Sequence, residues 1–335
     1  MRTRSIGDGR TTFDVSTIAL GTMFMGTRTD EATSFAILDR FVEAGGTFID
    51  TANNYNAWIG GHGHDSEDLI GRWLASRGIR DRIKIATKLG AAKKDPALPL
   101  STTPPTNYQG LGADTIRREA HESLRHLGVD HLDVLYGHVD DRDTAIAETV
   151  GAFGALQVEG AVGITGISNV AVWRVVEARE EAIRRNIAPY GLVQQQYSYI
   201  HPMPRIGRTN FVTPELLDYA ASTGVDGRPP LAVTAYSPLH QGAFTRTDKP
   251  LWGGVDHPTT HARLRMLHEV ARDLGATPNQ VALAWLLGGE VPVIPIVGAS
   301  SLAQLEETLG AAELDLDPEV RERLDAEPVG ALAAA

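Results

Sequence analysis

Cysteine is absent from this chain of 335 residues, and lysine is scarce. Without cysteine there can be no disulfide framework, no thiolate nucleophile and no cysteine-ligated zinc. The formal net charge of −11 argues against a general nucleic-acid or anionic-membrane surface. No apolar run approaches the roughly 18 residues of a membrane span, and the first residues lack the apolar core of a signal peptide. We therefore expect a cytoplasmic protein that binds neither nucleic acid nor membrane.

The rest of the composition is typical of a globular chain with a large core, at 42 % hydrophobic and 22 % charged residues. Short apolar runs alternate with longer amphipathic segments, which indicates buried strands alternating with helices. The expected strands are 16–21, 47–52, 83–89, 132–137, 163–168, 192–197, 231–237 and 291–297. The expected helices are 29–44, 66–77, 113–127, 145–158, 172–186, 214–222, 261–274 with 278–287, and 301–309.

Eight strand–helix units in this length predict a (β/α)₈ TIM barrel rather than an open sheet. A doubly wound dinucleotide fold is the competitor, but no G-x-G-x-x-G motif follows the first strand. We expect a single barrel domain over 1–335, with 325–335 as a flexible tail. A β-hairpin turning at Gly7-Asp8-Gly9 precedes the barrel, and the long βα loops 55–65 and 90–112 should lie at its catalytic face.

Four polar residues stand at or just beyond the ends of consecutive expected strands: Asp50, Tyr55, Lys88 and His138. Singly, each has an ordinary structural role, such as a turn cap, a surface aromatic, a solvated strand end or a packed imidazole. Together they suit one chemistry, because a buried Asp and Lys should pair. The tyrosine would donate a proton, the lysine would lower its pKa, the aspartate would fix the lysine and the histidine would orient a carbonyl group.

Seven stretches in register resemble the aldo-keto reductase superfamily over nearly the whole chain. They are GTFIDTANNY (46–55), KIATKLG (84–90), LDVLYGHVDD (132–141), GISN (166–169), QQQYS (194–198), AYSPL (235–239) and GASSLAQLEET (298–308). Members of that family are (β/α)₈ barrels that reduce aldehydes and ketones with NADPH. The resemblance implies an enzyme with a small carbonyl substrate and Asp50, Tyr55, Lys88 and His138 as its catalytic tetrad.

The resemblance also implies a cofactor site along the later strand ends. Its nicotinamide carboxamide would be bound by Ser168, Asn169 and Gln194, with Gln195 as the rival of Gln194. Tyr236 would stack on the nicotinamide ring. Ser237, Leu239 and Gly242 would pass beside the pyrophosphate. The residues implied at the adenosine end, where a helix begins, are Gly298, Ser300, Ser301, Gln304, Glu307 and Thr308.

Two positions depart from the family pattern at the adenosine end. The family often carries Lys or Arg within the stretch 298–304, where this chain has GASSLAQ. Position 308 is threonine, where asparagine is usual. NADPH remains the expected cofactor, with NADH as the alternative.

Other functions stay open beside this one. A Schiff-base aldolase would use Lys88 as its nucleophile, and a regulatory subunit of the same fold would bind the cofactor with little turnover. His62 and His64 beside Asp65 have no third ligand at a convincing spacing, so we expect no metal site. The oligomeric state is not predicted.

Loop 55–65 carries the expectation for the substrate. Trp58 would form an apolar wall of the pocket, and Asn53, Asn54 and Asn56 would add polar groups near it. That mixture suits a sugar or keto-sugar, while aryl aldehydes and ketosteroids are the alternative for a wide aromatic pocket.

Overall fold

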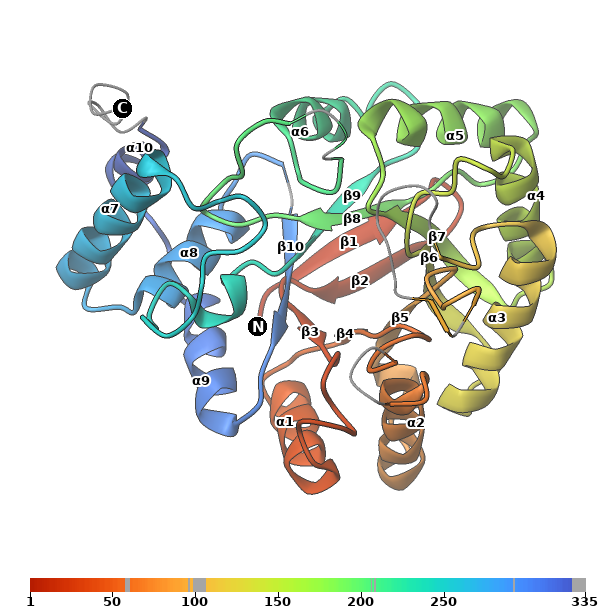
Figure 1. The fold of residues 1–335 in the computed structure, drawn as a ribbon, viewed down its shortest axis with the longest axis horizontal. Helices are drawn as coiled ribbons and strands as arrows, with labels where there is room; N and C mark the ends of the chain where they lie inside the picture. Colours follow the sequence, from red (N-terminus) through yellow and green to blue (C-terminus); the bar gives the residue numbers. More distant parts are fainter. Residues whose placement is uncertain are drawn as a thin grey trace.

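The computed structural model describes residues 1–57, 61–95, 97–98, 107–205, 207, 209–291 and 293–326. Eight parallel strands close a barrel in the order β10-β3-β4-β5-β6-β7-β8-β9 (Figure 1). The strands are β3 (Ala19–Gly21), β4 (Phe48–Asp50), β5 (Lys84–Leu89), β6 (Leu132–Gly137), β7 (Val162–Ser168), β8 (Leu192–Gln196), β9 (Ala232–Tyr236) and β10 (Val293–Gly298). The expected (β/α)₈ barrel is confirmed. Since all strands are parallel, their carboxyl ends meet at one mouth.

Helices surround the barrel on its outside (Figure 1). They are α1 (Glu31–Glu43), α2 (Asp65–Arg77), α3 (Ala113–Leu127), α4 (Ile146–Val158), α5 (Val172–Arg184), α6 (Pro214–Ala221), α7 (Pro258–Leu274), α8 (Pro278–Leu287), α9 (Leu302–Ala311) and α10 (Pro318–Asp325). Helix α10 was not predicted, because this short helix buries only Leu324 and therefore has little apolar periodicity. Within the described residues, no helix is long and apolar enough to cross a bilayer.

The N-terminal hairpin closes the end of the barrel opposite the strands' carboxyl ends. Its strands β1 (Thr3–Gly7) and β2 (Thr12–Ser16) are antiparallel, and Figure 1 shows them lying across the barrel. The Asp8 carboxylate accepts hydrogen bonds from two backbone N–H groups of the turn, as an Asx turn requires. Ile6 and Val15 pack against interior barrel residues such as Val134 and Ile164.

The first barrel strand is shorter than expected. The sequence predicted a strand over 16–21, whereas Ser16 ends β2 and β3 begins at Ala19. The hydroxyl of Ser16 donates to the carbonyl of Ile18 at 2.7 Å, which bends the chain between the two strands. The apolar run was therefore real, but it spans a corner rather than one strand.

Candidate active site

The four predicted catalytic residues come together at the carboxyl-terminal mouth of the barrel. The Lys88 ammonium donates to Asp50 Oδ1 at 2.5 Å, to Tyr55 Oη at 2.8 Å and to the carbonyl oxygen of Thr51 at 2.7 Å. Lys88 is fully buried, and these three acceptors match the three N–H groups of an ammonium. A buried lysine with this set of partners is held as a paired cation, in one position.

Strand register explains why Asp50 and Lys88 meet. Asp50 on β4 is paired with Ala86 on β5, and Lys88 follows Ala86 by two residues. Side chains two residues apart on a strand point to the same face, here the barrel interior. Tyr55 reaches the pair from the turn after β4, and its hydroxyl lies 3.5 Å from Asp50 Oδ1.

His138 completes the group directly after β6. Its ring lies edge-on to the Tyr55 ring, with a centroid separation of 6.0 Å and an interplanar angle of 74°. Its backbone N–H is fixed to the carbonyl of Leu89, and its Nδ1 has no hydrogen-bond partner among the described residues. Burial and the nearby Lys88 charge lower the pKa of His138 to about 3. The imidazole is therefore neutral at physiological pH.

The acidity of Tyr55 differs from the expectation. Lys88 was expected to lower the pKa of this phenol, but the pKa lies well above the ordinary value of 10.0. Burial is the largest cause, and the Asp50 carboxylate raises the pKa further. The ammonium of Lys88 is shared with Asp50, so the prediction of a lowered pKa is wrong for this state. Tyr55 is a protonated phenol at neutral pH.

The residues expected around the nicotinamide line the next strand ends. The amide of Gln194 donates to Asp50 Oδ2 at 2.9 Å, which joins β8 to the tetrad. Gln195, the rival, donates instead to the carbonyls of Val170 and Thr209. Alternation along the strand thus directs Gln194 to the tetrad and Gln195 away from it.

Asn169 connects the tetrad to the aromatic ring after it. Its amide donates to the carbonyl of His138 at 2.8 Å and to Ser168 Oγ at 3.0 Å, and its oxygen accepts from Tyr236 Oη at 2.7 Å. Asn210 donates to the same Tyr236 oxygen at 3.1 Å, so the ring is held from two sides. Asn169 has a φ of 56°, a left-handed conformation that asparagine tolerates better than most residues.

The segment after β9 has a strained backbone. Ser237, His240 and Gln241 have φ of 53°, 48° and 57°, and Gly242 follows at 88°. Such clusters of positive φ occur where a loop is shaped for a ligand. Leu239 lies within the same segment, partly buried against the α7–α8 side of the core.

Buried polar atoms in this segment test whether a dinucleotide fits. Both ring nitrogens of His240 and Nε1 of Trp252 have no partner among the described residues, and the two rings lie 4.8 Å apart. Nε2 of Gln196, at the end of β8, also has no partner among the described residues. Unpaired buried donors are costly, and oxygen atoms of a bound ligand would satisfy them. The residues present therefore fit an oxygen-rich group beside this loop.

The expected adenosine end is assembled at the end of β10 and the start of α9. Gly298 ends β10, and Ser301 caps α9. The backbone N–H and the hydroxyl of Ser300 both donate to Gln304 Oε1, at 2.8 and 3.0 Å. Both donors thus lie at a helix start, where an anion is favoured, and the Gln304 amide oxygen accepts from them.

The second turn of α9 faces a residue that the sequence analysis missed. Glu307 Oε1 accepts from Asn279 Nδ2 of α8 at 3.2 Å, and Thr308 is buried nearby on α9. Asn279 Oδ1 has no partner among the described residues. Nothing in the local sequence marks Asn279, because it lies in the first turn of an ordinary helix.

A family model described as the Aldo/keto reductase family matches residues 17–327. The chain belongs to that family. Aldo/keto reductases reduce carbonyl groups with a nicotinamide cofactor, so the protein is an oxidoreductase. The uncharacterized oxidoreductase YrpG of Bacillus subtilis is 35 % identical to this reductase, over 95 % of this chain and 93 % of its own.

Two fungal relatives have more specific names. The norsolorinic acid reductase stcV of Emericella nidulans is 31 % identical, over 94 % of this reductase and 79 % of its own chain. An aryl-alcohol dehydrogenase of Phanerodontia chrysosporium, whose name specifies NADP(+), is 29 % identical, over 91 % of this reductase and 80 % of its own chain.

The predicted substrate wall of the reductase is only partly described. Trp58 lies outside the described residues, so its role stays a prediction. The three asparagines expected beside it are 4 %, 6 % and 0 % exposed, in the order Asn53, Asn54 and Asn56. Asn53 donates to Glu119 and Asn54 to the carbonyl of Ala91, so these amides connect loops inside the protein. Both amide atoms of Asn56 have no partner among the described residues, so the polar groups expected beside a substrate stay a prediction.

His64 has a role other than the metal ligand considered above. Its ring stacks on that of His126, with centroids 3.9 Å apart, and its Nδ1 lies 2.5 Å from Glu67 Oε2. Burial opposes the charged ring, but the Glu67 carboxylate outweighs it and raises the pKa of His64. No group of three or more His, Asp or Glu side chains within the described part of the chain is placed to hold a metal ion.

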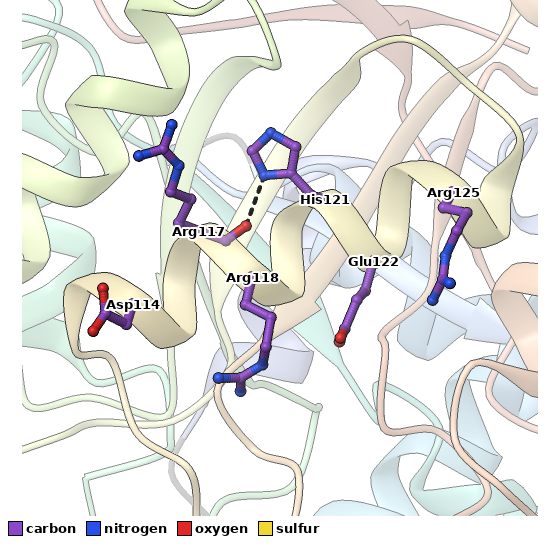
Figure 2. A pocket seen from close by; sticks show the side chains of 6 residues that line it. All are labelled: Asp114, Arg117, Arg118, His121, Glu122 and Arg125. Atoms are coloured by element: carbon purple, nitrogen blue, oxygen red, sulfur yellow. Dashed lines mark hydrogen bonds between the residues drawn. The ribbon is translucent and has the colours of Figure 1, made fainter.

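A hollow on the outer surface of the reductase lies away from this site. Figure 2 shows its six lining side chains spread along the single helix α3, with the His121 ring bonded to the carbonyl of Arg117 at 2.8 Å. Arg117 and His121 also lie within 3.4 and 3.9 Å of Glu159 on the next helix. These charges are paired with their neighbours, and the hollow contains no member of the tetrad.

Two buried carboxylates behind β5 were also missed. Glu67 of α2 and Glu119 of α3 are 0 % and 2 % exposed. Glu67 accepts from the hydroxyl of Thr87 at 2.5 Å, directly beside Lys88 in the chain. The sequence gives little sign of either, since both lie inside regular amphipathic helices whose other charged residues are mostly solvated.

Proposed function

We propose that this reductase converts an aldehyde or ketone to an alcohol, with NADPH as the hydride donor and Tyr55 as the general acid. The observation that carries the proposal is the Lys88 ammonium, which bridges Asp50 and the Tyr55 hydroxyl inside the barrel mouth. When bound, the reduced nicotinamide supplies a hydride to the carbonyl carbon. The protein must then deliver a proton to the carbonyl oxygen.

Tyr55 is suited to deliver that proton. Its raised pKa keeps the phenol protonated at neutral pH, which a proton donor requires. The phenol's own proton is held by a long contact to Asp50 Oδ1 at 3.5 Å, and Lys88 donates to the phenolic oxygen. As negative charge develops on that oxygen, the ammonium at 2.8 Å stabilises it. General acid catalysis of this kind contributes roughly 10²–10⁴-fold.

His138 would orient the carbonyl group. A neutral imidazole can donate one N–H without adding a competing acid, and the pKa of about 3 keeps the ring neutral. The centroid of its ring lies 6.0 Å from that of Tyr55, so a carbonyl oxygen near both polar groups would receive a hydrogen bond from each.

The cofactor would lie along the later strand ends. Ser168, Asn169 and Gln194 would bind the carboxamide, and the ring of Tyr236, held by two asparagines, would stack on the nicotinamide. Ser237, Leu239 and Gly242 would border the pyrophosphate. At the adenosine end the proposed residues are Gly298, Ser300, Ser301, Gln304, Glu307 and Thr308. The relative named for NADP(+) supports NADPH over NADH.

For the substrate, an aryl aldehyde or ketone is the better supported class. Two relatives carry the names of a norsolorinic acid reductase and an aryl-alcohol dehydrogenase. The sugar or keto-sugar expected from the asparagines has less support, because the amides of Asn53 and Asn54 donate to Glu119 and to the carbonyl of Ala91.

Oxidation of NADPH and of NADH, measured side by side over aryl aldehydes, alkyl ketones and keto-sugars, tests the proposal. We expect turnover with NADPH and the fastest rates with aryl carbonyls. Tight cofactor binding without turnover on any carbonyl would indicate a regulatory subunit instead. Borohydride trapping of Lys88 with a carbonyl compound would indicate an aldolase. The three acceptors on the Lys88 nitrogen oppose that chemistry, because a nucleophilic amine needs a free lone pair.

A further inference from the structure

Two side chains of the tetrad come from neighbouring segments, the end of β5 and the turn after β4. Lys88 lies on β5, whereas Tyr55 lies in an irregular turn after β4. The backbone of this turn is tied to its surroundings at Asn53, whose N–H donates to the carbonyl of Lys88 at 3.0 Å and whose carbonyl accepts from His64 N at 2.7 Å. The position of Tyr55 against Lys88 therefore depends on how Asn53 is held.

Glu119 holds the side chain of Asn53. This glutamate extends from α3 and is 2 % exposed. Its Oε2 accepts from Asn53 Nδ2 at 2.7 Å and from the backbone N–H of Gly90 at 2.8 Å. Asn53 precedes Tyr55 by two residues, and Gly90 follows Lys88 by two. One oxygen atom thus joins the turn that carries the proposed proton donor to the strand end that carries the cation.

The direction of the Gly90 N–H is itself fixed. Gly90 has a φ of 89°, and an added Cβ would lie 2.7 Å from a Leu111 side-chain carbon and 2.8 Å from the carbonyl oxygen of Gly110. Only glycine fits here, so the strand end presents this N–H to α3 in one geometry. The second Glu119 oxygen lies 3.3 Å from the guanidinium of Arg118, which partly balances the buried charge.

Burial of a carboxylate is unfavourable unless its hydrogen bonds compensate, and an apolar residue would serve packing alone better at this position of α3. Glu119 touches neither the proposed substrate position nor any proposed cofactor residue. We propose that Glu119 is a positioning residue of the reaction, whose carboxylate fixes the turn that carries Tyr55 against the end of the strand that carries Lys88. This inference rests on the proposed role of Tyr55.

The proposal separates proton delivery from cofactor binding. Loss of the carboxylate frees Asn53 Nδ2 and the Gly90 N–H, so the turn can shift relative to Lys88. A displacement of about 1 Å in a reacting group costs on the order of 10²-fold in rate. The proposed cofactor residues lie on β7 to β10 and on α9, and they keep their contacts. We expect kcat to fall about 10²-fold in Glu119→Ala, with the Kd of NADPH unchanged.

Steady-state kinetics of four variants test this inference. Glu119→Gln keeps one acceptor oxygen for both donors and should recover most of kcat. Asn53→Ala should lower kcat less than Glu119→Ala, since the bond to Gly90 remains. The double variant Asn53→Ala/Glu119→Ala should be no slower than Glu119→Ala, because both act through one contact. The solvent deuterium isotope effect on kcat should rise in Glu119→Ala, as the proton transfer becomes slower relative to other steps.

Asp133→Asn is the matched control. Asp133 is equally buried, and it accepts from the backbone N–H of Ile85 at 2.9 Å, at the opposite end of the same strand β5. It also pairs with Lys84 and Arg80. We expect its variant to lower the melting temperature without changing kcat or the isotope effect. That pattern would separate a buried carboxylate that stabilises β5 from one that positions Tyr55.

Three results would overturn the inference. The first is a Glu119→Ala enzyme with wild-type kcat and isotope effect, and the second is a Kd for NADPH that rises in parallel with the loss of kcat. The third is a set of additive losses of kcat in Asn53→Ala/Glu119→Ala. If Glu119→Ala fails to fold, Asn53→Ala decides, and a wild-type kcat and isotope effect in that variant would overturn the inference. Wild-type enzyme that turns over no carbonyl would refute the proposed function itself, and with it any role of Glu119 in the reaction.

Discussion

Replacement of Lys88 by methionine should lower the melting temperature of the protein and also abolish its activity. In this variant the Asp50 carboxylate loses its cation, although its side chain is only 3 % exposed. The amide of Gln194, at 2.9 Å, is the nearest donor that remains. Removing one partner of a buried ion pair costs about 3–5 kcal/mol. For 335 residues the unfolding entropy is about 0.7 kcal/mol/K, so the melting temperature should fall by about 4–7 °C.

The reciprocal variant, Asp50→Asn, should cost less. Lys88 keeps two acceptors, the carbonyl of Thr51 and the hydroxyl of Tyr55. Burial already lowers the pKa of Lys88, and loss of the carboxylate removes the largest opposing effect, so the lysine can release its proton. Between this lowered pKa and the ordinary value of about 10.4, the unfolded state binds more protons than the folded state. The stability of Asp50→Asn relative to wild type should therefore rise with pH in that window.

Thermal unfolding at neutral and at alkaline pH, beside NADPH oxidation, is the assay for both variants. The double variant Asp50→Asn/Lys88→Met should regain much of the stability lost in Lys88→Met while remaining inactive. That combination would separate the stabilising role of the pair from its catalytic role. A Lys88→Met protein that melts with wild type, or an Asp50→Asn protein that melts lower than Lys88→Met, would refute the reasoning.

Two further predictions concern His138 and the barrel packing. Since burial and Lys88 lower the pKa of His138 to about 3, the kcat of the wild type should show no inflection from this ring between about pH 5 and 8; an inflection there that disappears in His138→Gln would contradict it. Gly166→Ala places a Cβ 2.5 Å from a ring carbon of Tyr136 and should cost about 1–3 kcal/mol in denaturant unfolding. Gly151→Ala, in open space on α4, is its control and should be neutral or stabilising; equal effects of the two would count against the packing argument.

Strand patterns were enough to predict the barrel and its tetrad. Asp50, Lys88 and His138 stand out in the sequence because a polar residue at the end of an apolar run is unusual, and parallel strands bring such ends together. Strand alternation explains why Gln194 contacts Asp50 while Gln195 donates to other carbonyls, and the choice of Gln194 for the carboxamide stays a prediction. Local sequence pattern and strand topology are therefore enough to predict this part of the molecule.

Properties that depend on distant contacts were not predictable in this way. The direction of the Tyr55 pKa shift depends on burial and on the distance to Asp50, which spacing in the chain does not give. Glu119 and Asn279 lie in regular helices, and their partners are far away in sequence. The cap of α9 by Ser301 illustrates the opposite case, because a helix start is a local signal.

The central claim is that Tyr55 delivers the proton in carbonyl reduction, and Tyr55→Phe tests it most directly. The variant keeps the ring beside His138 and removes only the hydroxyl that Lys88 contacts. With an aryl aldehyde and NADPH, we predict that turnover is abolished while the Kd of NADPH stays within about twofold of wild type, which corresponds to a change of about 0.4 kcal/mol or less in cofactor binding. Turnover near the wild-type rate in Tyr55→Phe would contradict the account.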